Sequence, residues 1–131
     1  MNEIPDNAVF LPLKGEFYHA FIRKDKTYEL RGVFAQFKPN RITKGRPVIV
    51  SRGYSTPDRV CGVIGDVRIF NSIDEAMKSD IWSKIVPDSI KTDVQPLLKY
   101  YRERYTQFIA FEIVFNQKPL IPETDNTMEM F

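Results

Sequence analysis

Five segments of the chain are rich in apolar residues, either alternating with polar ones or in a continuous run. Each of these patterns is typical of a β-strand. The five segments are residues 7–13, 26–34, 47–52, 59–70 and 108–115. The last segment is almost entirely apolar and rich in β-forming residues, which predicts a central strand that is buried on both faces. In the segment 59–70, Gly62 and Gly65 predict a bulge or a bend.

Helical spacing of apolar residues predicts a first helix that begins at Gly15. The apolar residues that fall on one side of this helix are Phe17, Tyr18, Phe21 and Ile22. A second, short helix is expected to reach about Ser79, because Ser72 and Glu75 have the spacing of a capping box.

The clearest helical pattern follows a proline-marked connection at Pro87. Apolar and aromatic residues recur there at helical spacing, and Pro96 is tolerated because it falls in the first turn: Val94, Leu97, Leu98, Tyr101 and Tyr105. Five or six strands with two or three helices predict one α+β domain built on a small mixed sheet or barrel. We expect this domain to span residues 1–116, and residues 117–131, which lack periodicity, to form a loose tail.

The composition is that of one globular domain, with 131 residues, 43% hydrophobic and 27% charged. The single cysteine, Cys61, excludes an internal disulfide and is interpreted as a small buried residue. With one histidine there are almost no ligands for structural zinc, so no metal and no cofactor are predicted. The first residues do not resemble a signal sequence, and nowhere do about 18 apolar residues run together. We therefore expect a cytoplasmic protein with no membrane partner.

The net charge is only +2, but positive charge is concentrated between residues 38 and 59. Six lysines and arginines in this stretch face one acid, Asp58, so a polyanion would be attracted most strongly here. The residues predicted to contact phosphate groups are Lys38, Arg41, Lys44 and Arg46. The alternative interpretation is a solvated basic surface without a ligand.

The run from Lys26 to Arg31 is the strongest candidate for a binding site. Alternation in a strand places a hydroxyl, a carboxylate and a guanidinium on one face, those of Thr27, Glu29 and Arg31. The intervening tyrosine and leucine can then enter the core. This ridge beside Lys26 suits a polar, anionic ligand. The alternatives are an exposed edge strand and a salt bridge between Glu29 and Arg31 with only a structural role.

A further candidate contact lies at the end of the segment 47–52. Arg52 and Tyr54 stand close together in the sequence, and an aromatic ring beside a guanidinium can stack on a base. An ordinary turn explains the same residues.

Two stretches carry a family resemblance. The first, LPLKGEFYHAFIRKDKTYELRG, holds the run just described, and the second, LLKYYRERYTQFIAFEIVF, holds the last predicted helix and strand. With the order of elements, they resemble the ASCH domain, a small β-barrel of the PUA-like superfamily, over most of the chain from Leu11 to Phe115. The first stretch is similar to that family's Gly-Lys-Thr-x-Glu-x-Arg-type strand, with Asp25 in place of the usual glycine before Lys26.

The resemblance implies a small PUA-like mixed β-barrel with two or three peripheral helices and an RNA- or nucleotide-related role. It also implies a cleft beside the barrel that is lined by Lys26, Thr27, Glu29 and Arg31. Members of the family differ in function. Some bind RNA or act in coactivator complexes, one branch hydrolyses N4-acetylcytidine, and another has been described as a ribonuclease.

Our first hypothesis is therefore a module that binds RNA, a nucleotide or a nucleoside, with the cleft and the basic loop as its contacts. The alternative is a small nucleic-acid-related hydrolase in which Lys26 stabilises developing negative charge and Glu29 acts as general base. The amidohydrolase branch has a threonine nucleophile where this chain has Glu29, and a carboxylate cannot replace an alkoxide there. A protein-interaction adaptor is a third interpretation, and the oligomeric state is left open.

Overall fold

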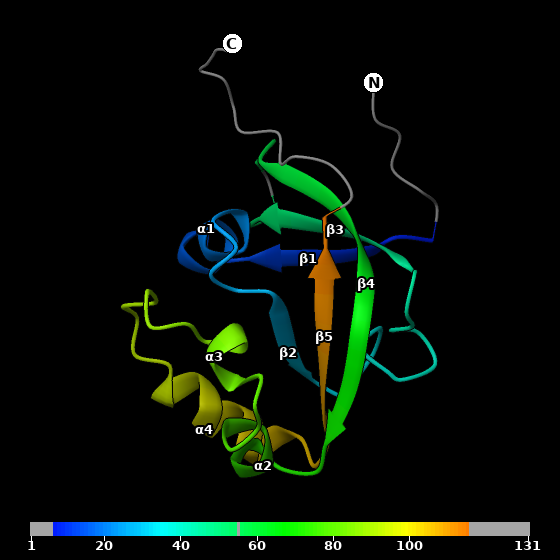
Figure 1. Cartoon of the computed structure of the whole chain (residues 1–131). Coiled ribbons are helices and arrows are strands. Elements are labelled where there is room, and N and C mark those ends of the chain that lie inside the picture. The colour runs from blue at the N-terminus through cyan, green and yellow to red at the C-terminus, as the bar shows by residue number, and fades with distance from the viewer. Residues whose placement is uncertain (1–6, 55, 116–131) are drawn as a thin grey trace.

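A computed structural model describes residues 7–54 and 56–115 of the chain. Within these residues, Figure 1 shows a curved sheet with the later helices grouped at its lower left and the first helix apart from them at the upper left. The strands are β1 (Val9–Leu13), β2 (Tyr28–Gly32), β3 (Pro47–Arg52), β4 (Arg59–Phe70) and β5 (Phe108–Val114). The helices are α1 (Gly15–Ile22), α2 (Ile73–Met77), α3 (Trp82–Ile85) and α4 (Gln95–Arg104). The expected α+β class is confirmed, and the expected tail at 117–131 lies outside the described residues.

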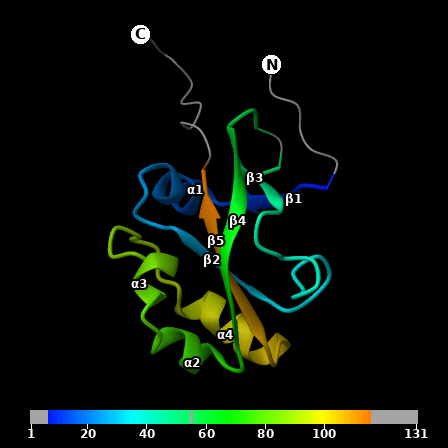
Figure 2. The same ribbon diagram turned by 45° about the vertical axis from the view of Figure 1, so that its right-hand side comes forward.

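The five strands form one mixed sheet in the order β1-β3-β4-β5-β2. β1 pairs with β3 in parallel, and the other three pairs are antiparallel. The sheet curves into a half-barrel, and the long β4 follows the whole length of that curve in Figures 1 and 2. β1 and β2 are its two edges, and the expected small mixed barrel is confirmed.

β5 is the central strand that its apolar run predicts, because β4 and β2 pair with its two sides. Alternation sends its odd-numbered residues, such as Ile109 and Phe111, into one core cluster inside the curve of the sheet. Phe108 and Ala110 point the other way, into a second cluster that α2 and α4 cover. The sheet therefore separates two apolar layers.

The glycines of β4 mark an irregularity, as predicted. The register of β4 against β5 shifts between Ile64 and Val67, next to Gly65. A Cβ atom at Gly65 would clash with the Glu112 carboxylate, and one at Gly62 would lie 2.8 Å from the carbonyl oxygen of the facing strand. Glycine at both positions lets the two backbones approach where the sheet bends.

Three of the helices correspond to the sequence patterns. α2 begins after Ser72, whose Oγ accepts a hydrogen bond from the Glu75 amide, and α4 has Pro96 in its first turn. α3 was not predicted, since a single turn of helix is too short to show periodicity. Among the helices of the described residues, none combines the length and apolar character that crossing a membrane requires.

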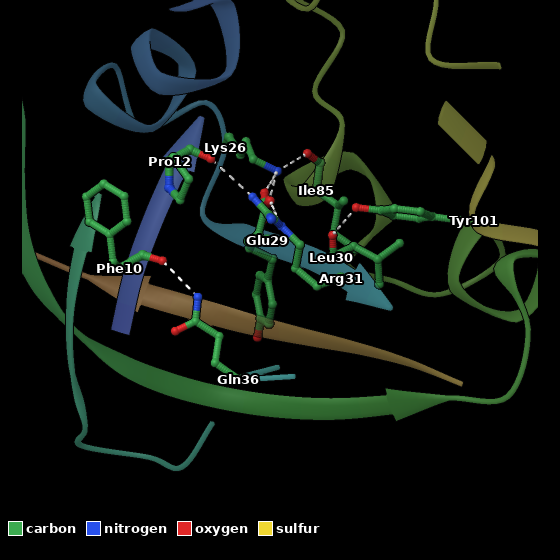
Figure 3. A network of polar contacts seen from close by, with 10 residues as sticks. Phe10, Pro12, Lys26, Glu29, Leu30, Arg31, Gln36, Ile85 and Tyr101 are labelled. Atoms are coloured by element: carbon green, nitrogen blue, oxygen red, sulfur yellow. Dashed lines mark hydrogen bonds and ion pairs between the residues drawn. The ribbon is translucent and has the colours of Figure 1, made fainter. Parts of the chain in front are cut away.

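Side chains bridge the two edges of the half-barrel. Arg31 on β2 donates from Nη2 to the Pro12 carbonyl of β1 at 3.3 Å, and Gln36 donates from Nε2 to the Phe10 carbonyl at 3.2 Å (Figure 3). Pro12 has no N–H group to offer at this edge. Arg31 therefore links the two edge strands of the half-barrel, β1 and β2.

Candidate functional site

A cleft of about 490 Å³ opens beside β2, between the start of α1, the end of β1, α3 and α4. Its walls are mainly apolar, with Phe17 from α1, Trp82 from α3 and Leu97 from α4 among them. Lys14 and Asp93 also line the cleft, and both are exposed. A volume of this size with apolar walls and few polar groups is typical of a site for a small organic ligand.

The floor of the cleft holds a buried ionic cluster of Lys26, Glu29 and Arg31 (Figure 3). The Glu29 carboxylate lies 3.1 Å from the Lys26 Nζ through one oxygen and accepts a hydrogen bond from the Arg31 Nε at 2.7 Å through the other. Lys26 is 2% exposed and Glu29 7%, whereas the Arg31 side chain is 23% exposed. Arg31 is therefore the member of the cluster that solvent or a ligand can reach.

Lys26 is fully occupied by the protein itself. Its ammonium group has three N–H donors, and it donates to the Tyr28 carbonyl at 2.8 Å and to the Ile85 carbonyl at 2.6 Å, besides its ion pair with Glu29. Its Nζ also lies 5.1 Å from the centre of the Phe21 ring. Three acceptors around one nitrogen match the charged form, so Lys26 is an ammonium that ties β2 to α3.

The charges of this ionic cluster shift one another's pKa values. Burial alone would raise the pKa of the Glu29 carboxyl, but Lys26 and Arg31, through charge and hydrogen bonds, hold it below its ordinary value. Burial would lower the pKa of Arg31, and the Glu29 charge raises it instead. Burial also lowers the pKa of Lys26, against the attraction of Glu29. Two cations and one carboxylate leave a net positive charge at the cleft floor.

Tyr101 of α4 completes the floor. Its hydroxyl donates to the Leu30 carbonyl at 3.2 Å, and burial raises the pKa of this phenol, so it remains protonated. The Thr27 carbonyl accepts from Ile113 of β5, so the backbone of Leu30, three residues further on, faces away from β5. The open edge of β2 thus forms part of the cleft.

Comparison with known proteins adds evidence on the fold. No protein-family model and no curated protein sequence matches the chain. Solved structures do match: the crystal structure of the hypothetical protein PH0355 has a TM-score of 0.61 at 17% identity and covers 82% of this chain and 98% of that one. The solution NMR structure of PF0455 from Pyrococcus furiosus gives 0.55 at 16% identity, with 84% and 98% covered. The crystal structure of ASCH from Zymomonas mobilis gives 0.57 at 14% identity, with 86% and 71% covered.

The chain has an ASCH-like fold. The resemblance inferred from the sequence is thereby confirmed at the level of the fold. Identities of 14–17% between these chains establish the fold alone, so the chemistry of the cleft is argued from its own residues.

The ASCH-like fold brings three residues of the predicted binding run together at the cleft: Lys26, Glu29 and Arg31. Tyr28 and Leu30 enter a core cluster, as predicted, but burial does not alternate along β2, because Glu29 between them is also buried. Thr27 precedes the strand and does not line the cleft, and its amide donates to the Lys84 carbonyl while its own carbonyl accepts from Ile113.

The predicted contacts at the end of β3 lie outside the cleft. The Arg52 Nε is paired with the Asp58 carboxylate at 2.6 Å. Tyr54 is 74% exposed, and its ring centre lies 6.0 Å from that of Phe10. These two residues therefore do not contribute to the walls described above.

The basic loop 38–46 is also separate from the cleft in the ASCH-like fold. In Figure 1 this loop lies on the right, whereas α3 and α4 lie on the left; in Figure 2 it again lies on the right, with α3 on the left and α4 at the bottom centre. Arg46 stabilises the loop by donating to the carbonyls of Asn7 and Arg41. The side chains of Lys38, Arg41 and Lys44 are exposed.

Several residues of the cleft were missed by sequence reasoning. Trp82 and Asp93 come from segments with no motif, and Lys14 lies in the first stretch of the family resemblance without being singled out there; they reach the cleft because α1, α3 and α4 pack around β2. Trp82 is the single tryptophan of the chain, which is the one feature that singles it out in the sequence.

Proposed function

We propose that this protein binds a nucleotide, and through it single-stranded RNA, with one base inserted in the cleft beside β2. The observation that carries the proposal is an apolar cleft of about 490 Å³ with a net positive ionic cluster at its floor. Apolar walls suit the faces of a base, and a positive floor suits its carbonyl groups or a phosphate. The RNA-related role implied by the family resemblance agrees with this chemistry.

Arg31 is the residue we assign to ligand contact. A guanidinium has five N–H groups, and within the described part of the chain its bonds to Glu29 and Pro12 use two of them. The remaining donors belong to a side chain that is partly exposed and lines the cleft. Glu29 fixes the orientation of this guanidinium, so little side-chain entropy is lost when a ligand binds.

Lys26 and Glu29 are better suited to positioning than to catalysis. Glu29 has both carboxylate oxygens engaged and a lowered pKa, which makes it a weak general base. Lys26 is buried, and its donors are directed at protein acceptors. These contacts favour binding over the hydrolase that the sequence left as an alternative.

Trp82 allows a direct test of the proposal, because the single tryptophan of the chain lines the cleft. We expect AMP, GMP, CMP or UMP to change its fluorescence saturably. Leu97→Glu places a carboxylate on a cleft wall and should abolish this response. Ile69→Glu is the matched control, since Ile69 is 40% exposed against 43% for Leu97 and lies on β4, away from the cleft.

Two results would contradict this proposal. One is the absence of a saturable response to all four nucleotides, and the other is equal binding by Leu97→Glu and Ile69→Glu. Incubation with acylated cytidines and with single-stranded RNA tests hydrolysis separately. Product formed by the wild type and lost in Lys26→Ala and Glu29→Gln variants that remain folded would favour the enzyme instead. The cytoplasmic location expected from the sequence stays a prediction.

A further inference from the structure

Aromatic rings lead out of the cleft along α4 to the end of β2. Tyr101, at the cleft floor, has its ring centre 6.0 Å from that of Tyr105, which lies 6.3 Å from that of Phe34. Tyr100 lies 6.3 Å from Tyr101, and the Arg104 guanidinium lies 4.8 Å from the centre of the Tyr100 ring. We call these five residues the aromatic ledge.

Two rings of the aromatic ledge are exposed, and both are carried by hydrogen-bonded backbone, that of α4 for Tyr100 and that of a turn for Phe34. Phe34 is 64% exposed and Tyr100 is 45% exposed. The backbone of Phe34 is held by two hydrogen bonds with Phe37, across a turn in which Ala35 has a φ of 53°. Tyr105 packs against Gly32, where a Cβ atom would clash with its ring. The rings are therefore presented by rigid backbone.

The charge around the aromatic ledge is positive. Residues 33–46 contain no Asp or Glu, and Lys38 and Arg41 follow Phe34 closely as exposed residues. On α4, Arg104 contributes a further cation at the Tyr100 ring, and the exposed Glu103 is the one acid of this helix. Exposed rings among cations are complementary to stacked bases with a phosphate backbone, whereas an apolar peptide would gain nothing from the cations.

We propose that the aromatic ledge is the path of single-stranded RNA that leaves the cleft, with bases stacked on Tyr100 and Phe34 and the backbone running towards the loop 38–46. The cleft end of this path rests on the proposed function. Stacking on exposed rings accepts any base, so we expect the ledge to add affinity without sequence preference.

The test compares UMP with a fluorescein-labelled uridine hexanucleotide. We expect the hexanucleotide to bind the wild-type protein more tightly than UMP. Phe34→Ser and Tyr100→Ser should each weaken hexanucleotide binding by about 5- to 100-fold and leave UMP binding unchanged. Ile69→Ser is the control for loss of an exposed apolar side chain. Two separate ledge variants keep the test informative if one of them fails to fold.

The outcomes separate this inference from the proposed function. A hexanucleotide that binds no more tightly than UMP, or a Phe34→Ser effect equal to that of Ile69→Ser, overturns the ledge and leaves nucleotide binding in the cleft intact. Self-association that Phe34→Ser abolishes, with hexanucleotide binding unchanged, would overturn it in favour of an interface between copies of the chain. Hexanucleotide binding that depends on Phe34 without any UMP binding would support the ledge and contradict the cleft.

Discussion

The ionic cluster at the cleft floor and the basic loop 38–46 hold their charges in different ways. In the cluster, Lys26 and Glu29 are buried, and each makes contacts that fix its geometry. In the loop, Lys38 and Arg41 extend into solvent. A buried charge that loses its partner destabilises the fold, whereas an exposed charge acts mainly through long-range attraction.

Because of this difference, we expect the two regions to have different roles. The cluster is preorganised, so at the cleft floor a ligand meets a guanidinium that Glu29 and Pro12 already orient, whereas Lys14 at the wall is exposed. The loop does not line the cleft, and the hollow of about 600 Å³ that it does line is a separate one, shared with Asp66 and Glu112. We therefore expect the cluster to control stability and nucleotide affinity, and the loop to control the salt dependence of RNA binding.

The largest expected effect is that of Glu29→Gln on stability. Removing the carboxylate leaves two cations at the cleft floor without their partner, and breaking a buried ion pair in this way costs about 3–5 kcal/mol. Glu103→Gln, at an exposed position of α4, should stay within about 0.5 kcal/mol of the wild type. Urea unfolding measures both, and similar losses from the two variants would refute the distinction.

The pH dependence of this loss should identify its cause. The folded-state pKa of Glu29 lies below its ordinary value of 4.5. Its contribution to stability is therefore fully present above that value and is lost as the pH falls through the folded-state pKa. The difference in unfolding free energy between wild type and Glu29→Gln should be constant near neutral pH and shrink as the pH falls below 4.5. A difference that persists unchanged in acid would assign the loss to packing.

Regular periodicity is what made most of the fold predictable. β5 and α4 are long enough for apolar residues to reveal period and burial, and Gly62 and Gly65 marked the bend of β4. α3 is a single turn without such a signal. Because α3 forms one wall, periodicity alone could not locate the cleft, and the family resemblance was the only indication of a cleft beside the barrel.

The candidate site was predictable only as far as local alternation reaches. A period of two placed Glu29 and Arg31 on one face, and their contact at 2.7 Å follows from it. The hydrogen bond from Lys26 to the Ile85 carbonyl joins residues far apart in the sequence. No local pattern could therefore predict that protein acceptors occupy all the donors of the Lys26 ammonium. For the same reason, the sequence could not predict the hydrogen bond between Arg31 and the Pro12 carbonyl, which links the site to the edge strand β1.

A smaller effect is expected from Arg31→Lys, which keeps the charge and removes the planar group. Lysine cannot hold Glu29 and Pro12 and a ligand at once with the same geometry, so nucleotide affinity should fall about tenfold. Arg52→Lys is the matched control, because Arg52 pairs with Asp58 outside the cleft. Trp82 fluorescence titration measures both, and an equal loss in the two variants would count against Arg31 as the contact residue.

The smallest effect is expected from Lys38→Gln in the loop. Stability should change by less than about 0.5 kcal/mol, since the side chain is exposed. UMP affinity should not change, because Lys38 does not line the cleft. The plot of log affinity against log salt for the hexanucleotide should become less steep by about 0.7, the value for one lost phosphate contact on a single strand. Lys78→Gln, another exposed lysine, provides the reference slope. If the two variants have the same slope, Lys38 and its loop take no part in RNA binding. The loop and the ionic cluster would then differ only in their effect on stability.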